Sequence, residues 1–166
     1  MKNQKMKSMK KLIFTVALII CFTGLAKPQQ SGFGLGVMFG EPTGISFKGW
    51  ISERSAIDGG LGWSYVHEGS IHIHVDYLYH FYNVFDNQKI PLYLGVGGRI
   101  KLKNNNENNN SNNSDMRIGV RIPFGISYQF TEVPVDIFLE VAPILDLNPS
   151  TQGSVNGALG VRYYFK

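Results

Sequence analysis

The segment from Met116 to Phe130 alternates without exception between large apolar side chains and small, polar or positively charged ones. The even positions are Met116, Ile118, Val120, Ile122, Phe124, Ile126, Tyr128 and Phe130, and the odd ones are Arg117, Gly119, Arg121, Pro123, Gly125, Ser127 and Gln129. Successive side chains of a β-strand point to opposite faces, so this period of two predicts one long strand. Strands of globular proteins usually have about five or six residues, whereas a tilted transmembrane strand needs roughly 9 to 11. The segment is therefore long enough to cross a lipid bilayer.

Residues 1–26 have the three parts of a secretory signal peptide. The first part carries Lys2, Lys5, Lys7, Lys10 and Lys11 and no acid, Leu12 to Ile20 carries no charge, and Gly24-Leu25-Ala26 offers small residues before a cleavage site. We predict a cleaved signal peptide over 1–26 and one mature domain over 27–166. Two alternatives remain: a transmembrane anchor, for which the apolar part is short, and a lipoprotein acylated at Cys21, for which Ile20 is an atypical preceding residue.

The mature chain has a different charge from the whole sequence. The 166 residues carry a formal net charge of +4, but residues 1–26 hold five of the sixteen bases and none of the twelve acids. The mature net charge is therefore −1, which gives no support to a nucleic-acid partner. The only cysteine, Cys21, lies in the leader, so no disulfide is expected in the mature chain.

Alternation recurs along the whole mature chain, in segments separated by turn residues. Eight segments are predicted to be strands: 31–39, 45–51, 56–65, 71–84, 90–103, 116–130, 135–147 and 154–165. No segment keeps a period of 3.6 residues, so no helix is expected after residue 26. The predicted fold class is all-β, an eight-stranded antiparallel up-and-down transmembrane β-barrel preceded by the signal peptide.

The two faces of the predicted strands differ in charge. The apolar face has no charged residue, whereas the opposite face carries six bases and five acids: Lys48, Arg99, Lys101, Arg117, Arg121, Arg162, Asp58, Asp76, Asp136, Glu140 and Asp146. The polar face also carries many glycines, among them Gly97, Gly119 and Gly160, which suit the crowded inside of a narrow barrel. We therefore predict lipid outside and a charged interior, although alternation alone leaves open a soluble periplasmic ligand-binding barrel with the faces reversed. A one-residue slip would put every charge into lipid, so the register is strongly specified.

Aromatic residues and loop lengths predict an orientation. With both termini in the periplasm, Phe33, Tyr79, Phe81, Tyr128, Phe130, Tyr163 and Phe165 fall at the periplasmic end, and Phe39, Trp63 and Tyr65 at the outer end. Two such girdles are typical of membrane barrels. The same orientation places the Asn-rich run from Asn104 to Asp115 in an outer loop, where its low complexity is tolerated.

The chain resembles the small OmpA/OmpX-type outer-membrane barrels. Its closing segment, Gly157 to Phe165, is similar to their C-terminal insertion signal, with the departure that Lys166 follows the final aromatic residue. The segments Gly34 to Val37 and Gly40 to Ser46 also resemble an uncharacterised bacterial outer-membrane barrel family. The resemblance implies localisation in the outer membrane, contact with its lipids and insertion by the barrel-assembly machinery. It does not imply an activity.

The eleven inward charges are expected to form a buried network, because side chains fill the interior of an eight-stranded barrel. From the hairpin registers we predict that Asp76 pairs with Arg99 and Glu140 with Arg162. A narrow ion path through this network is an alternative. Pro123 and Pro143 lie inside predicted strands, and we expect local bulges at both.

Two chemical sites are weaker alternatives. His72, His74 and Asp76 share one face of a strand at steps of about 6.7 Å, and a His-x-His pair with a carboxylate is able to bind a metal. Ser64, His67, Glu68, Ser70 and His72 gather near the second outer loop, as in a lipid A-modifying hydrolase or acyltransferase, but no triad spacing is present. We predict no catalytic, cofactor or metal site. The expected function is a monomeric, non-enzymatic barrel with a structural role or a surface-interaction role through its outer loops, toward an extracellular partner that the sequence does not identify.

Overall fold

The structure is a computed structural model, and it describes residues 32–64, 70–103 and 115–165. The predicted signal peptide, the segment with His67 and Glu68, and the Asn-rich run up to residue 114 lie outside these residues. The described chain forms nine strands: β1 (Phe33–Gly40), β2 (Thr43–Trp50), β3 (Ser55–Ser64), β4 (Ser70–Phe81), β5 (Leu92–Lys103), β6 (Asp115–Arg121), β7 (Phe124–Gln129), β8 (Val135–Asn148) and β9 (Gln152–Phe165). The described residues contain no helix that is long and apolar enough to cross a membrane.

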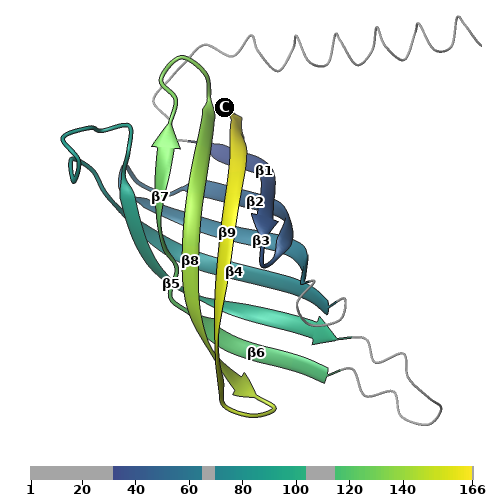
Figure 1. Cartoon of the computed structure of the whole chain (residues 1–166). Coiled ribbons are helices and arrows are strands. Elements are labelled where there is room, and N and C mark those ends of the chain that lie inside the picture. The colour runs from purple at the N-terminus through teal and green to yellow at the C-terminus, as the bar shows by residue number, and fades with distance from the viewer. Residues whose placement is uncertain (1–31, 65–69, 104–114, 166) are drawn as a thin grey trace, which may run out of the picture.

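The strands form a closed antiparallel ring (Figure 1). Consecutive strands pair from β1 to β6 and from β7 to β9, β1 pairs with β9, and the pairing of β4 with β5 joins the two halves of the ring. Both β6 and β7 pair with β5 on one side and with β8 on the other. The two strands therefore occupy a single position in the ring, one after the other along the chain. The all-β, up-and-down barrel predicted from the alternation is confirmed.

Pro123 divides the long strand predicted for 116–130 into β6 and β7, because proline has no N–H to donate to the sheet. The wall continues across the gap through two backbone hydrogen bonds, from Gly95 N to the Pro123 carbonyl (2.8 Å) and from Ile122 N to the Pro143 carbonyl (3.0 Å). The bulges predicted at the two prolines are wrong. Pairing with β5 keeps one register on both sides of Pro123, Pro143 lies in unbroken β8 opposite Val155, and the register shift lies between Ile118 and Gly119.

Burial follows the alternation around the ring. On β4 the even residues from Ser70 to His80 are buried, and the odd residues from Ile71 to Phe81 are exposed apolar side chains. The same division separates exposed Val120 from buried Arg121 on β6, and exposed Leu139 from buried Glu140 on β8. Apolar residues thus cover the outside of the barrel, while the interior holds the polar residues together with a few apolar ones such as Leu78 and Phe138.

The two ends of the barrel are distinct. The C-terminus lies at the same end as the connections 51–54, 82–91 and 130–134, which we call the terminal end (Figure 1). The opposite end, here called the loop end, carries the connections 41–42 and 149–151, the last residues of β3 and β5, and the first residues of β4 and β6. Outward aromatic pairs mark the terminal end on three strands, with ring centroids 5.1 Å apart for Tyr79 and Phe81, 4.7 Å for Tyr128 and Phe130, and 5.1 Å for Tyr163 and Phe165.

Candidate functional site: the charged interior of the barrel

The barrel interior holds nearly all the charged side chains of the strands. Ten of the eleven predicted inward charges are buried, and Arg117, near the loop end, is half-buried. Arg121 and Arg162 are each 1% exposed and are among the largest fully buried side chains of the described chain. Their positions follow from strand geometry, because every second residue of a strand points to the same side.

Inward glycines make room for these side chains on neighbouring strands. A Cβ at Gly60 would lie 2.7 Å from His74 Cε1, and one at Gly119 would lie 2.5 Å from Asp146 Oδ1. A Cβ at Gly97 would overlap the Asp76 carboxylate and the backbone beside it. The glycines of the polar face therefore set where large polar side chains fit inside the ring.

Arg121 connects two carboxylates near the middle of the barrel. Its Nε lies 3.0 Å from Asp76 Oδ2, and its Nη2 donates to Glu140 Oε1 at 2.5 Å. The Tyr93 hydroxyl donates to the other oxygen of Glu140 at 3.2 Å. We call Asp76, Arg121 and Glu140 the first triad.

Arg162 forms a second triad with Asp58 and Asp136. Its Nε and Nη2 donate to the two oxygens of Asp136 at 3.1 and 3.3 Å, and its Nη1 donates to Asp58 Oδ1. The Tyr164 hydroxyl also donates to Asp136 (2.8 Å), and the guanidinium carbon of Arg162 lies 4.0 Å from the centroid of the Phe138 ring. The second triad therefore links β3, β8 and β9 across the interior.

Ion pairs continue toward the loop end. Arg99 holds Asp146 with two hydrogen bonds, from Nε at 3.0 Å and from Nη2 at 2.6 Å, and Nη2 also donates to Ser154 Oγ at 2.9 Å. A bidentate contact of this kind fixes both the distance between the guanidinium and the carboxylate and their relative orientation. The arrangement joins β5 to β8 and β9.

Lys101 and Glu41 form the pair nearest the loop end, with Nζ 3.6 Å from Oε1. Ser64 lies between them, because its hydroxyl donates to Glu41 Oε1 and accepts a hydrogen bond from Lys101 Nζ at 2.7 Å. Nothing in the turn sequence of Glu41 marks it as inward-facing, and the sequence reasoning missed it.

The terminal end of the interior combines one base with aromatic rings. Lys48 Nζ lies 2.7 Å from His80 Nε2 and 4.6 Å from the centroid of the Trp50 ring. The Trp50 and His80 rings approach with centroids 4.5 Å apart, and Tyr93 lies 5.5 Å from His80. The sequence reasoning also missed His80 and Tyr164, although both lie on the inward parity of their strands and were detectable from it.

The two specific ion pairs predicted from hairpin registers are wrong. Among the described residues, Asp76 pairs with Arg121 and not with Arg99, and Arg99 pairs with Asp146. Glu140 pairs with Arg121, while Arg162 pairs with Asp136, its direct neighbour across β8 and β9, and with Asp58. The predictions were wrong because they assumed incorrect hairpin registers. They also left out contacts across the lumen, which join strands far apart in sequence.

The candidate metal residues are not brought together as a set of His72, His74 and Asp76. The structure instead groups Asp58, His74 and Asp76, with one ligand atom of each within 4.8 Å of the others. His72 lies next to the group, its ring edge-on to His74 with centroids 5.4 Å apart.

The candidate lipid-modifying residues do not form a nucleophile–base pair in the part of the chain that the structure describes. Ser64 and Ser70 lie opposite each other across β3 and β4, and both are fully buried. Ser64 bonds Glu41 and Lys101, and neither ring nitrogen of His72 has a hydrogen-bond partner. His67 and Glu68 lie outside the described residues.

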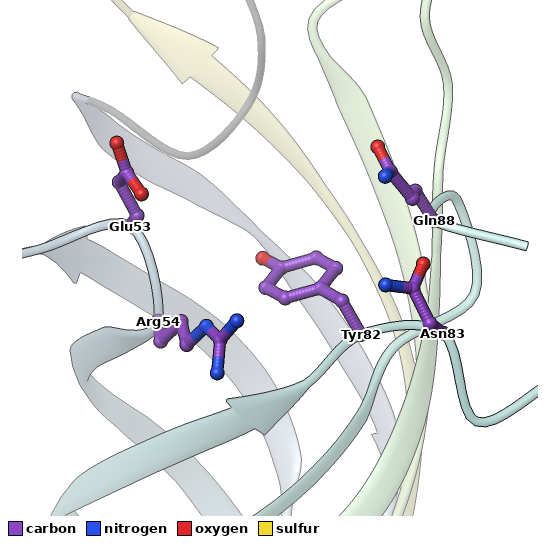
Figure 2. A pocket seen from close by; sticks show the side chains of 5 residues that line it. All are labelled: Glu53, Arg54, Tyr82, Asn83 and Gln88. Carbon is purple, nitrogen blue, oxygen red and sulfur yellow. The ribbon is translucent and has the colours of Figure 1, made fainter.

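A pocket of about 200 Å³ lies at the terminal end, outside the lumen network. Figure 2 shows its lining: Glu53 and Arg54 from the β2–β3 turn face Tyr82, Asn83 and Gln88 from the β4–β5 connection. None of the eleven inward charges lines this pocket, so it is separate from the interior site.

The comparisons with known proteins fit this geometry. The family model described as "Protein of unknown function (DUF3996)" matches residues 26–165. The chain belongs to this family. Among solved structures, the chain is similar to the N-terminal beta-barrel domain of Pseudomonas aeruginosa OprF, with a TM-score of 0.63, 18% identity, and coverage of 84% of this chain and 100% of that one. The comparison with curated proteins gives no match. At this identity the likeness shows the fold alone, that of a β-barrel domain.

Proposed function

We propose that this DUF3996 chain is a monomeric, non-enzymatic barrel of the outer membrane, with a structural role or a surface-interaction role through the loop end. The observation that carries the proposal is the inverted distribution of side chains. The outward face exposes large apolar residues on every strand, whereas the charges are buried inside. A water-soluble barrel has the opposite need, since charged groups lose their hydration when buried.

The extent of the apolar face supports a lipid environment. Soluble monomers rarely expose contiguous apolar patches larger than a few hundred Å². Here exposed apolar residues cover all sides of the ring, including Phe39 at 60% exposure and Trp63 at 58%. Lipid acyl chains are the partner that covers such a face without a specific shape.

The closed ring satisfies the second demand of a bilayer. No water is present in the bilayer core to bond free N–H and C=O groups, so a spanning sheet must close on itself. Pairing of β1 with β9 removes the edges of the sheet. A chain of this kind would reach the membrane with the help of the barrel-assembly machinery, and the apolar alternation of β9 suits that recognition.

Fractionation combined with surface proteolysis tests the proposal. We expect the protein in the outer-membrane fraction, with faster migration in detergent gels before heating than after it. Protease added to intact cells should cut within 104–115, whereas the turns at the terminal end should be cut only after lysis. Recovery in the soluble periplasm would contradict the proposal and favour a ligand-binding barrel.

Two measurements separate the remaining alternatives. The hydrogen bond of Lys48 with His80 and the ion pairs up to Lys101 span the lumen. We therefore expect no step conductance in planar bilayers, and regular steps would indicate a narrow ion pore. Mass spectrometry of membrane lipids, lipid A included, should show no change on deletion or overexpression. A reproducible change in acylation would indicate a lipid-modifying enzyme instead.

A further inference from the structure

We propose that Asp58, His74 and Asp76 form a binding site for a divalent transition-metal ion, of the Zn²⁺ class, inside the barrel. The three side chains come from the adjacent strands β3 and β4 and lie near the middle of the wall. The inference does not depend on the membrane location of the protein.

The strand register brings the three side chains together. Asp58 lies directly opposite Asp76, and Gly60 lies directly opposite His74. Because Gly60 has no side chain, the His74 ring lies over this position, where a Cβ would be 2.7 Å from Cε1. One strand thus presents His74 and Asp76 at inward positions two residues apart, and the other presents Asp58 to both.

The donor atoms are buried and include atoms without hydrogen-bond partners. Asp58, His74 and Asp76 are 3%, 4% and 1% exposed. Within the described part of the chain, no hydrogen bond reaches His74 Nδ1 or either carboxylate oxygen of Asp76, whose contact with Arg121 is an ion pair only. Buried polar atoms are nearly always bonded, so this cluster needs a further partner.

The local charge balance indicates that the partner is a cation. Each triad has two carboxylates and one guanidinium, and therefore a charge of −1 when all its groups are ionised. Asp76 belongs to the first triad and Asp58 to the second. The excess negative charge of both triads is therefore concentrated where these two carboxylates face each other. Like charges directly opposite in a sheet are destabilising. Lys48 lies opposite Asp58 across β2 and β3 and offsets one of the two negative charges, which leaves one in excess, and its Nζ bonds His80 Nε2.

The ligand set selects the class of ion. One imidazole and two carboxylates suit Zn²⁺ and its neighbours in the transition series better than Mg²⁺ or Ca²⁺, which prefer oxygen ligands alone. Donor atoms within 4.8 Å of one another lie at most about 2.8 Å from a common centre, against about 2.0–2.2 Å in zinc sites. Small side-chain rotations are enough to close this difference.

The triads also position the ligands. Arg162 holds Asp58 through Oδ1, which leaves Oδ2 for an ion, and Arg121 lies beside Asp76 Oδ2, which leaves Oδ1. Arginine partners of ligating carboxylates fix their orientation, and loss of such a partner typically weakens metal affinity about 10- to 100-fold. Arg121 and Arg162 are thus positioning residues for the proposed site.

Cobalt titration of the purified protein tests the inference, in detergent where the protein is recovered from membranes and in buffer where it is recovered in soluble form. Co²⁺ substitutes for Zn²⁺ and is visible by its ligand-field absorption. We expect one Co²⁺ per chain, displaced by Zn²⁺, and a loss of affinity on the order of 100-fold or more in His74→Gln and in Asp76→Asn. His80→Gln is the matched control, because it changes another buried histidine of the same strand face outside the cluster; its affinity should equal that of the unmodified protein.

Three outcomes would overturn the inference. The first is the absence of saturable binding to the unmodified protein. The second is binding that persists in His74→Gln but disappears in His67→Gln, which would place the ion in the β3–β4 connection. The third comes from X-ray absorption of the Zn²⁺-loaded unmodified protein, a measurement that remains decisive if the variants do not fold. The proposed site requires one imidazole among oxygen ligands, and a sulfur ligand or two or more imidazoles would contradict it.

Discussion

The outer wall and the lumen of this barrel are built from alternate residues of the same strands, yet they specify structure in different ways. On the wall, Val120, Leu139 and Ile73 are exposed, and their requirement is only to be apolar. In the lumen, Arg121 and Arg162 each contact two named carboxylates. The wall therefore depends on chemical type, whereas the lumen depends on position and partner.

Removing one lumen base should have the largest effect. Arg162→Met leaves Asp58 and Asp136 without their shared partner, and breaking a buried ion pair by removing one member costs about 3–5 kcal/mol. Urea unfolding in lipid vesicles measures the loss. The triple change Arg162→Met, Asp58→Leu and Asp136→Leu is the control, because apolar replacement of the whole triad should recover most of the stability. A loss below about 1 kcal/mol in Arg162→Met would show that the triad is not buried.

Placing a charge on the wall should have the next largest effect. Val120 faces outward near the middle of its wall, and Val120→Arg should cost about 2–4 kcal/mol in a bilayer. Val120→Leu, which keeps the apolar character, should change the free energy of unfolding by less than about 0.5 kcal/mol. Equal stability of the two variants in vesicles would mean that water, and not lipid, covers this face.

Substitutions at two adjacent glycines compare how much room each face of the sheet has for one added methyl group. Gly97→Ala puts a Cβ against the Asp76 carboxylate and the backbone of Val75, so we expect a loss of about 1–3 kcal/mol. Gly98→Ala points outward, and the nearest atom to its Cβ is the Gly119 carbonyl oxygen at 3.8 Å. It should be neutral within about 0.5 kcal/mol. If the two variants unfold at the same urea concentration, the lumen is looser than the structure describes.

The smallest effect is expected at the loop end. Arg117 is half-buried and donates to Gln152 Oε1 at 3.3 Å. An interaction near solvent contributes little, so Arg117→Gln should change the unfolding free energy by less than about 0.5 kcal/mol. The same denaturation assay checks it, with Arg121→Gln as the comparison, and a loss as large as that of Arg121→Gln would place Arg117 in the buried network.

Alternation was sufficient to predict the fold because burial in a closed sheet follows the two-residue period of each strand. It correctly placed Val120 and Ile73 on the outer face, and their neighbours Arg121 and His74 in the interior. It did not predict the break after Arg121, which depends on the missing N–H of Pro123.

The contacts inside the lumen were beyond the reach of sequence patterns. Arg99 meets Asp146 and Arg162 meets Asp58 across the barrel, and strand tilt and stagger decide which inward residues reach the same level. The pairing of Arg162 with Asp136 depends on the β8–β9 register. An error in the assumed turn length shifts this register and so changes every predicted cross-strand pair of the hairpin. Asp58 joined His74 and Asp76 for the same reason, since its position opposite Asp76 requires the β3–β4 register.

The two tryptophans of the chain lie on opposite sides of the wall and provide the most direct test of its inverted arrangement. Trp63 is 58% exposed on the outside, whereas Trp50 contacts Lys48 and His80 inside. The measurement is fluorescence quenching by phospholipids brominated in their acyl chains, on the Trp50→Phe and Trp63→Phe proteins in vesicles. The account predicts strong quenching of Trp63 and little of Trp50. Quenching of Trp50 alone, or of neither residue, would contradict it.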